Sequence, residues 1–409
     1  MTPIILNPKQ LEAKEKFLYW YQHPESRVRP WFEISGPAGS GKTTVVKSIT
    51  SELGYSDGDE ILYVAFIGKA ALALRLSGVP GRTIHSVVYH PIKVQAVNKE
   101  TKEPIFINGS PKMTLTFIKN EILGNGNVKL IVLDEAGMVE TIMGNDLLSF
   151  GVPILALGDL NQLPPVFGNS IFLQKPDVIL DTVMRQSKDS PILYIADLAR
   201  MGYQIQYGTY GAEGDVNVVR KKDFLCSHEF AQAMLKDQDM VICGTNNMRD
   251  NLNWYIRSHM YGRQEQMVEI GEKLICRHNY WTTLLPKNPD IALTNGMIGY
   301  AEYVDRRPQK NRGKIEIDFR PEFANDVFRG LPIDRKYVFD PYDKRKTVMT
   351  FGDSSFVFEL GYAITCHLSQ GSQAQNVLVF VESYENSDYF RKWLYTAVTR
   401  ARKRLTIVM

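Results

Sequence analysis

The stretch that decides the fold is Gly36-Pro37-Ala38-Gly39-Ser40-Gly41-Lys42-Thr43. It matches the pattern GxxxxGK[ST] in full, follows the apolar segment Trp31–Ser35 and leads into a helical pattern from Thr43 to Leu53. Glycines let the backbone curl so that its N–H groups face an anion, and the start of the helix adds a favourable dipole. The stretch therefore predicts a phosphate-binding loop, with Lys42 on the β- and γ-phosphates and the Thr43 hydroxyl on Mg²⁺.

Further apolar runs of strand length follow this loop. They lie at Ile61–Phe66, Val128–Leu133 and Ile154–Leu157, with a helical pattern at Lys69–Leu76. Continuous apolar strands separated by helices indicate a parallel sheet that is covered on both faces. Between residues 86 and 117 the pattern changes to short alternating stretches, which predict a β-hairpin that leaves the sheet. We therefore expect a first α/β domain over residues 1–182.

A second α/β unit begins near Val183. Its predicted helices are Pro191–Arg200 and Asn246–Tyr261, and its predicted strands are Met240–Cys243, Phe356–Leu360, Val377–Val381 and Leu405–Val408. Residues 262–352 differ, because they are rich in charged residues, proline and glycine and contain alternating stretches such as Lys314–Phe319. Alternation at period two predicts a small β-rich insertion. We expect residues 183–261 and 353–409 to form the second α/β domain around it.

Two acidic residues complete the predicted phosphate site. The apolar run Leu130–Leu133 leads directly to Asp134 and Glu135. A strand that ends there would place the Asp134 carboxylate at the sheet edge, where it can hold Mg²⁺, and Glu135 next to it could polarise the attacking water. The string Gly158–Val166 follows the next apolar run, and its Gln162 could sense the γ-phosphate by hydrogen bonding. Its two prolines stiffen this loop.

Composition limits the classes of protein. Of the 409 residues, 44% are apolar and 23% are charged, which is normal for a soluble globular protein. No apolar run reaches 18 residues and no secretory signal is present, so we expect a cytoplasmic protein without a membrane segment. The four cysteines contain no CxxC pair, which argues against structural zinc or an iron–sulfur cluster. The net charge of +3 is compatible with a nucleic-acid partner, but only through local patches.

In chain order, these and further motifs resemble superfamily 1 helicases, specifically the RecD/Dda-like branch. The matching strings are Leu6–Gln10, Gly36–Thr43, Val64–Leu72, Thr83–Ser86, Asp134–Met138, Gly158–Val166, Met184–Gln186 with Ser190–Ile192, Gly361–Ser372 and Leu394–Arg402. The resemblance implies two RecA-like P-loop domains, with a β-hairpin in the first and a small SH3-like β insertion in the second. It also implies an ATP-dependent 5′→3′ DNA helicase, and the layout is similar to that of phage Dda helicases.

The resemblance also implies roles for individual residues. The candidate catalytic residues are Lys42, Asp134, Glu135, Gln162, Arg185 and Arg400. The candidate ATP-binding residues are Gln10 (for adenine), Gly36, Pro37, Ala38, Gly39, Ser40, Gly41, Lys42, Thr43, Thr44 and Gly371. Thr43 and Asp134 would hold Mg²⁺. The candidate DNA contacts are Lys69, Thr83, His85, Phe106, Asn246, Thr365 and His367.

Some of these roles have simpler alternatives. An arginine suits a γ-phosphate because its rigid fork bridges two oxygens, and an arginine supplied across a cleft couples hydrolysis to domain closure. Arg185 and Arg400 could instead form structural salt bridges. His85 and His367 could be structural residues, and Phe106 could be a core aromatic rather than a residue that stacks on a base pair.

The chain departs from the family pattern at two positions. Phe66-Ile67 stands where the family usually has Pro-Thr, and Gly137 stands where a serine is usual. We expect single-stranded and forked duplex DNA as partners, with replication or recombination proteins as further candidates, and a monomer. The alternative function is an ATP-dependent translocase that displaces proteins without productive unwinding. A non-catalytic binding module is disfavoured because Lys42, Glu135, Gln162 and Arg400 are intact.

Overall fold

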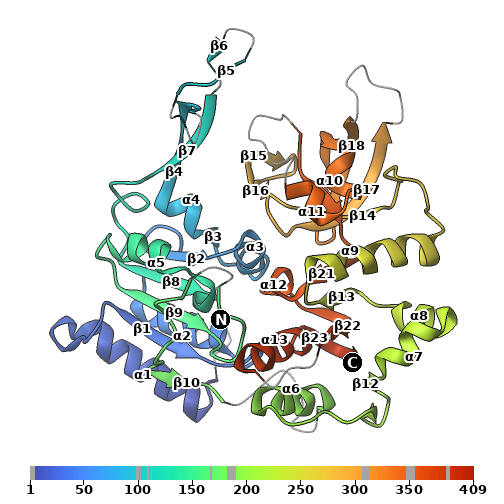
Figure 1. Ribbon diagram of the computed structural model, residues 1–409. Helices are drawn as coiled ribbons and strands as arrows, with labels where there is room; N and C mark the ends of the chain where they lie inside the picture. Colours follow the sequence, from blue (N-terminus) through green and yellow to red (C-terminus); the bar gives the residue numbers. More distant parts are fainter. Residues whose placement is uncertain are drawn as a thin grey trace.

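The computed structural model describes residues 5–97, 101, 103–107, 110–111, 113–165, 168–181, 190–305, 314–346, 355–383 and 387–409. Two six-stranded sheets and one five-stranded sheet organise them (Figure 1). None of the helices in this described part has the length and apolar character that crossing a membrane requires.

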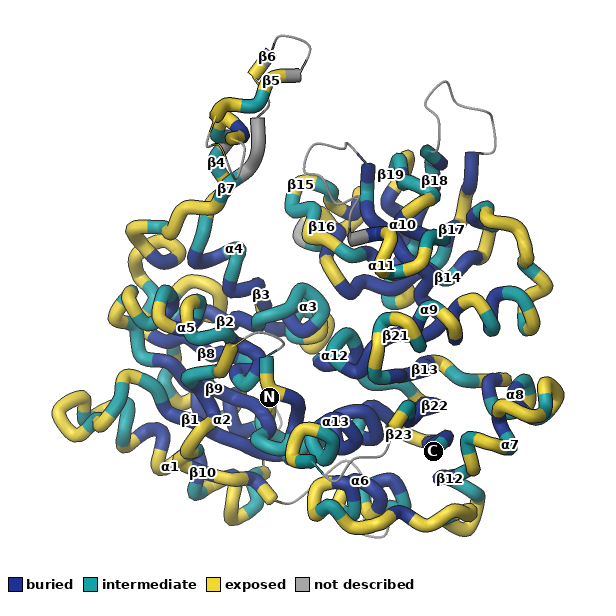
Figure 2. Tube along the Cα trace, in the orientation of Figure 1, coloured by how far each residue is buried: buried dark blue, intermediate teal, exposed yellow. Residues whose placement is uncertain are grey.

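The first sheet carries the phosphate loop. Its strand order is β10-β1-β9-β8-β2-β3, and every neighbouring pair is parallel. The strands are β1 (Trp31–Ser35), β2 (Ile61–Ala65), β3 (Arg82–Thr83), β8 (Leu130–Asp134), β9 (Ile154–Gly158) and β10 (Val178–Ile179). Its helices are α1 (Pro8–Gln22), α2 (Lys42–Leu53), α3 (Gly68–Leu76), α4 (Ile84–Val88) and α5 (Thr141–Leu148). The central strands are buried (Figure 2), which confirms the predicted parallel sheet and explains its continuous apolar runs.

The second sheet repeats this architecture. Its order is β11-β12-β23-β22-β13-β21, and only the β11–β12 pair is antiparallel. The strands are β11 (Gly208–Tyr210), β12 (Val216–Val219), β13 (Met240–Cys243), β21 (Ala363–Thr365), β22 (Ala374–Phe380) and β23 (Ala401–Val408). The helices are α6 (Pro191–Met201), α7 (Lys221–Cys226), α8 (His228–Leu235), α9 (Asn246–Tyr255), α12 (Cys366–Ser369) and α13 (Asp388–Val398). The two α/β domains lie side by side, with α3, α12 and α13 near their junction (Figure 1).

A β-hairpin projects from the first domain, as the change of pattern predicted. Strands β4 (Tyr89–Gln95) and β7 (Met113–Lys119) pair antiparallel, from Tyr89 opposite Lys119 to Gln95 opposite Met113. The short strands β5 (Phe106–Ile107) and β6 (Ser110–Pro111) continue it outward. The hairpin starts three residues later than predicted, because the one-turn helix α4 precedes it. It stands away from the body of the molecule (Figure 1).

The third sheet is antiparallel throughout, in the order β19-β18-β17-β14-β20. Its strands are β14 (Lys273–Cys276), β17 (Ile298–Asp305), β18 (Lys314–Pro321), β19 (Phe328–Asp334) and β20 (Phe358–Leu360), beside the hairpin of β15 (Tyr280–Leu285) and β16 (Asn288–Leu293). The helices α10 (Arg335–Phe339) and α11 (Tyr342–Lys346) follow β19. The pattern had assigned Phe356–Leu360 to the second α/β sheet, and this was wrong: β20 pairs with β14. A short apolar run has no periodicity that identifies its sheet. The SH3-like character of this insertion and the domain boundaries stay predictions.

A buried ion pair joins this insertion to the second domain. After α9 the chain forms a π-helical turn (η3, Ile256–Met260), where the pattern predicted a continuous helix to Tyr261. This turn directs Arg257 inward, where its Nε donates to Glu272 Oε2 at 3.0 Å, and both side chains are fully buried. The remaining guanidinium N–H groups donate to backbone carbonyls, and the Tyr362 hydroxyl donates to Glu272 Oε1 at 2.6 Å. Such full satisfaction is what makes a buried charge pair tolerable.

We predict that Glu272→Ala lowers the free energy of unfolding by about 3–5 kcal/mol, because it leaves the Arg257 charge buried without its partner. Urea denaturation followed by circular dichroism measures this change. The matched control is Glu302→Ala, which removes a partly exposed ion pair with Arg320 and should change stability far less. Equal losses of stability in the two variants would contradict the role of the buried pair.

Candidate functional site

The phosphate loop is tightly curled between β1 and α2. Gly39 and Gly41 have φ of 86° and 85°, in the left-handed region that favours glycine. A Cβ at Gly41 would also lie 2.2 Å from Gln10 Nε2, and one at Gly36 would lie 2.7 Å from the Leu180 carbonyl oxygen. Backbone and neighbours therefore leave no room for side chains at these positions. Helix α2 begins at Lys42, so its free N–H groups face the loop.

The two functional side chains that open α2 lie where the motif predicts. Lys42 Nζ donates to the carbonyl oxygens of Gly36 (2.5 Å) and Pro37 (3.1 Å), so the ammonium lies against the curl of the loop. Thr43 follows with an exposed side chain. The Lys42 ammonium and the Thr43 hydroxyl are thus at the same end of α2, as binding of phosphate and metal by this motif requires.

Gln10 is in direct contact with the phosphate loop. It belongs to a capping box at the start of α1, in which its Oε1 accepts from Asn7 N at 3.0 Å. Its Nε2 donates to the Ser40 carbonyl oxygen at 3.1 Å, and the side chain is buried. Sequence spacing did not show this contact between residues 30 positions apart. Its role in reading adenine stays a prediction.

The acidic pair lies at the end of β8, as predicted from the apolar run before it. Asp134 Oδ1 accepts from the backbone N–H of Glu135 at 3.0 Å. Glu135 has φ 51° and ψ 41°, a left-handed conformation that is uncommon for a residue with a side chain and that clusters at functional sites. Burial and the neighbouring Asp134 raise the pKa of the Glu135 carboxyl, while Arg400 and Lys42 act in the opposite direction. A raised pKa suits a carboxylate that accepts a proton from water.

The residues present fit a magnesium ion. Thr43 and Asp134 offer a hydroxyl and a carboxylate, both oxygen donors. Burial raises the pKa of the Asp134 carboxyl, and the Lys42 ammonium acts in the opposite direction. Within the described ranges, no group of three or more His, Cys, Asp or Glu residues could hold a metal. Mg²⁺ usually takes one or two protein oxygens and completes its shell with water and substrate phosphates, so a sparse donor set is compatible with it.

The loop after β9 connects the two domains. Asp159 Oδ2 accepts from the Tyr395 hydroxyl of α13 at 2.8 Å and from Gln162 Nε2 at 3.4 Å. Leu163 N donates to Thr396 Oγ1 at 2.9 Å, and Gln370 Nε2 donates to the Leu163 carbonyl oxygen at 3.1 Å. The sequence string Gly158–Val166 points to Gln162 but gives no sign that Tyr395 and Thr396 lie next to this loop. No local pattern relates residues more than 230 positions apart.

Arg400 faces this junction from the second domain. It is 2% exposed, and its guanidinium donates to Thr396 O (2.9 Å), Ser372 O (3.1 Å) and Thr399 Oγ1 (3.1 Å). Burial and Asp134 raise the pKa of the Glu135 carboxyl, and the Arg400 charge acts in the opposite direction. Because Thr396 also accepts from Leu163 N, Arg400 lies at the contact between the two domains. Arg185, the other candidate arginine, lies outside the described residues.

Gly371 lies at a different part of the domain junction. It has φ 69°, and a Cβ there would be 3.3 Å from Ile67 Cδ1 and 3.4 Å from Ala70 Cβ of α3. Ile67, which stands where the family has threonine, therefore makes an apolar contact across the two domains. Gly137, the second departure, has space for a side chain, because a Cβ there would meet Leu173 at an ordinary 3.4 Å.

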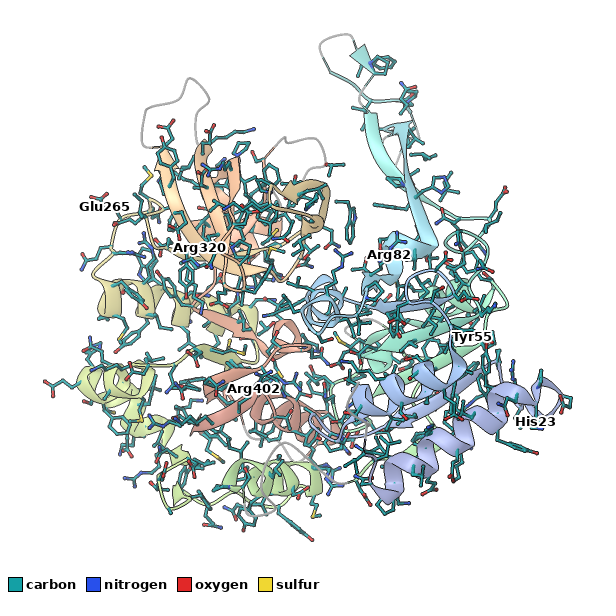
Figure 3. All side chains as sticks on the ribbon, turned by 180° about the vertical axis from the view of Figure 1, so that it is seen from behind. His23, Tyr55, Arg82, Glu265, Arg320 and Arg402 are labelled. Carbon is teal, nitrogen blue, oxygen red and sulfur yellow. The ribbon has the colours of Figure 1, made fainter. Side chains whose placement is uncertain are left out.

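A large cavity lies between the two domains, next to the first residues of the phosphate loop. Its volume is about 1320 Å³, and it is lined by Gly36–Ala38 and Asp159–Asn161 of the first domain and by Tyr194, Tyr395 and Arg402 of the second, among others. Figure 3 shows Arg402 on β23, near the middle of the molecule. The volume is ample for a nucleotide.

Two of the candidate DNA contacts of the first domain, Thr83 and His85, lie at α4. Thr83 is buried and caps α4, accepting from Ser86 N at 3.3 Å. The His85 ring lies 5.3 Å from Tyr89 and 6.3 Å from Phe117 between centroids. These residues line a hollow of about 310 Å³ whose opposite wall includes Trp281 of β15. Phe106 is 58% exposed near the outer end of the hairpin, so it is not a core aromatic.

The candidates of the second domain lie at α9, β21 and α12. Asn246 opens α9 and its Oδ1 accepts from Arg249 Nη1 at 2.9 Å. Thr365 is buried at the end of β21, and the His367 ring lies 6.5 Å from that of Tyr389. Burial lowers the pKa of His367 and of His85. Neutral imidazoles suit stacking or hydrogen bonding rather than ion pairing with a phosphate.

Lys69 lines a second interdomain cavity, of about 960 Å³, between α3 and the second domain. Burial, together with the charges of Lys273 and Arg400 and against that of Glu322, lowers the pKa of Lys69 to about 8. The amine is therefore partly neutral near pH 8, which weakens the case for a fixed phosphate contact in this conformation.

We predict that the Lys69 amine titrates near pH 8, well below an ordinary lysine, because a lowered pKa means that the proton leaves at lower pH. Competitive labelling with a trace acylating reagent between pH 6 and 11, read by mass spectrometry, measures it. The exposed Lys16 serves as the reference lysine within the same chain. A titration midpoint of Lys69 near that of an ordinary lysine would contradict the claim that burial lowers its pKa.

Comparisons with known proteins agree with this geometry. A family model described as "AAA domain" matches residues 6–221, and a "UvrD-like helicase C-terminal domain" model matches residues 360–408. The ATP-dependent DNA helicase dda of Enterobacteria phage T4 is 23% identical over 346 residues, covering 80% of this chain and 70% of that protein. The ATP-dependent RecD2 DNA helicase of Deinococcus radiodurans is 24% identical over 397 residues, covering 91% of this chain but 46% of that protein.

A solved structure supports the fold. The crystal structure of Pif1 helicase from Bacteroides in complex with ADP-AlF3 and ssDNA has a TM-score of 0.54 at 17% identity and covers 98% of this chain and 92% of that one. Both α/β domains are therefore RecA-like, as the resemblance implied. From the model matches and the relatives together, the chain belongs to the AAA-domain family and is a superfamily 1 helicase of the Dda/RecD-like type.

Proposed function

We propose that this chain is an ATP-dependent DNA helicase that moves 5′→3′ along single-stranded DNA and separates duplex ahead of it. One observation carries the proposal: Thr396 of the second domain accepts one hydrogen bond from Leu163 of the first domain and another from Arg400, so the arginine lies at the contact with the loop that carries Gln162. Phosphate-binding, acidic and arginine groups then belong to one site that exists only when the two domains meet. A site of this kind couples hydrolysis to domain movement.

Each side chain has a part in hydrolysis. Lys42 and the N–H groups of the loop hold the phosphates, while Thr43 and Asp134 hold Mg²⁺. When bound, Mg²⁺ neutralises charge on the phosphate oxygens. Glu135 accepts a proton from the attacking water, and its strained backbone fixes its direction. Arg400 stabilises charge on the γ-phosphate once it exchanges its carbonyl partners for phosphate oxygens.

The DNA would cross both domains on the side of the hairpin and the third sheet. His85, Thr365, His367 and the nearby rings of Tyr89 and Phe117 offer hydroxyl and aromatic contacts, which bind strands with little sequence preference. The names of the relatives, a phage and a bacterial ATP-dependent DNA helicase, support DNA as the substrate. The strings Thr83–Ser86 and His367–Gly371 support 5′→3′ polarity through the family resemblance.

We further propose that the enzyme works as a cytoplasmic monomer. Both Lys42 and Arg400 come from the same chain, so a second copy is not needed to complete the site. Replication or recombination proteins stay candidate partners.

We predict that the protein unwinds a forked duplex that has a 5′ single-stranded tail and not one that has only a 3′ tail. Strand separation followed by a fluorophore–quencher pair under single-turnover conditions measures this. Normal DNA-stimulated ATP hydrolysis without unwinding of either substrate would instead favour the translocase that displaces proteins. Unwinding from the 3′ tail alone would reverse the assigned polarity.

We predict that Lys42→Ala lowers ATP hydrolysis by at least about 100-fold, because the β- and γ-phosphates lose their cation. Its affinity for single-stranded DNA, measured by fluorescence anisotropy without nucleotide, should change little. Lys47→Ala, an exposed lysine on the same helix, is the matched control and should hydrolyse ATP normally. Retained hydrolysis in Lys42→Ala would show that the site is wrongly assigned.

A further inference from the structure

The loop that carries Gln162 is held by the second domain as well as by the first, in which Leu160 N donates to Ser35 Oγ at 3.1 Å. The backbone N–H and carbonyl of Leu163 pair with Thr396 Oγ1 and Gln370 Nε2. The Leu163 side chain is 2% exposed and packs within the apolar core of the second domain, which includes Ile192, Leu394 and Val398. Hydrogen bonds and apolar packing therefore both hold Leu163 against the second domain.

A third contact reaches the loop from its other end. The buried Tyr395 hydroxyl donates to Asp159 Oδ2, while Asp159 Oδ1 accepts from the backbone N–H of Asn161 at 3.0 Å. The carboxylate therefore has donors on both oxygens. Its Oδ2 is shared, because Gln162 Nε2 donates to it at 3.4 Å.

These contacts determine the direction of the Gln162 amide. Its nitrogen is directed at Asp159, so its Oε1 points the opposite way. Oε1 is buried and, among the residues that the structure describes, has no hydrogen-bond donor. A buried acceptor without a donor is costly, and such atoms concentrate where a ligand or reactant supplies the partner. An amide oxygen in that position can accept from the attacking water of ATP hydrolysis.

We propose that Tyr395 is a positioning residue that orients Gln162 through Asp159, so that hydrolysis requires the second domain to be docked on the loop. This inference rests on the proposed function and deepens it. Separation of the domains removes the Tyr395, Thr396 and Gln370 contacts together and leaves the Gln162 amide with only its 3.4 Å hydrogen bond to Asp159 in its own loop. In this arrangement the position of the Gln162 amide depends on domain docking as well as on the bound nucleotide.

The test is a double-mutant cycle on ATP hydrolysis with saturating single-stranded DNA. Tyr395→Phe removes one hydroxyl, and the expected result is a fall in kcat of about 10- to 100-fold, since a misplaced group costs that much. The KM for ATP should change by less than about twofold. Combined with Gln162→Ala, Tyr395→Phe should cause no further loss, because both changes act through one amide.

A matched control separates positioning from general destabilisation. Tyr63 of β2 is also a buried tyrosine whose hydroxyl donates to an aspartate, Asp57, at 2.7 Å, away from the cleft. Tyr63→Phe should change kcat by less than about twofold relative to the wild type. Its effect should be the same whether or not Gln162 is replaced by alanine. Thr396→Ala, which removes the partner of Leu163 N, supplies an independent variant and should reproduce the loss in kcat.

The outcomes distinguish the inference from the function on which it rests. Three results would overturn the positioning role and leave the helicase proposal intact. They are effects of Tyr395→Phe and Gln162→Ala that multiply in the double variant, a raised KM for ATP with unchanged kcat in Tyr395→Phe, and an equal loss of kcat in Tyr63→Phe. A wild-type protein without DNA-stimulated hydrolysis would overturn both. A full kcat in both Tyr395→Phe and Thr396→Ala would also refute the positioning role.

Discussion

Hydrogen bonds between Leu163 and the pair Thr396 and Gln370 join two sheets that are otherwise built independently. Each sheet is parallel at its centre and buries its own apolar strands, so each satisfies its backbone without the other. What neither sheet possesses alone is a complete site for phosphate chemistry. Lys42, Asp134 and Glu135 end strands or open helices of the first sheet, and Arg400 follows α13 of the second. We infer that the docking of one short loop on the second domain brings these groups together.

The docking of the domains also affects the charges around Glu135. Glu135 is buried beside Asp134, which favours its protonated form, while Arg400 and Lys42 favour the ionised form. Moving Arg400 away therefore changes both the charge on the phosphate site and the basicity of Glu135. The apolar contact of Ile67 with Gly371 lies at the same boundary. Under the proposed function, contact between the domains and readiness for hydrolysis are therefore coupled in this chain.

Local sequence signals predicted the elements that hold the site but not its connections. The strand, loop and helix around Gly36–Thr43 follow from glycine positions and periodicity, and the structure has them within one residue. The acidic pair likewise follows from an apolar strand that ends at Asp134. The Tyr395–Asp159 bond could not be predicted, because its two residues are 236 positions apart and no local pattern pairs the two strings that contain them. The π-helical turn at Ile256–Met260 was missed for a related reason, since Arg257 enters the core only because Glu272 is already there.

The most direct test of the account is translocation itself. In a stopped-flow experiment, the protein is mixed with ATP on single strands of increasing length that carry a fluorophore at the 3′ end. The account predicts a lag before the fluorescence change that grows in proportion to length, and no such lag with the fluorophore at the 5′ end. A signal whose timing is independent of length would contradict the claim that docking of the two domains drives movement along DNA.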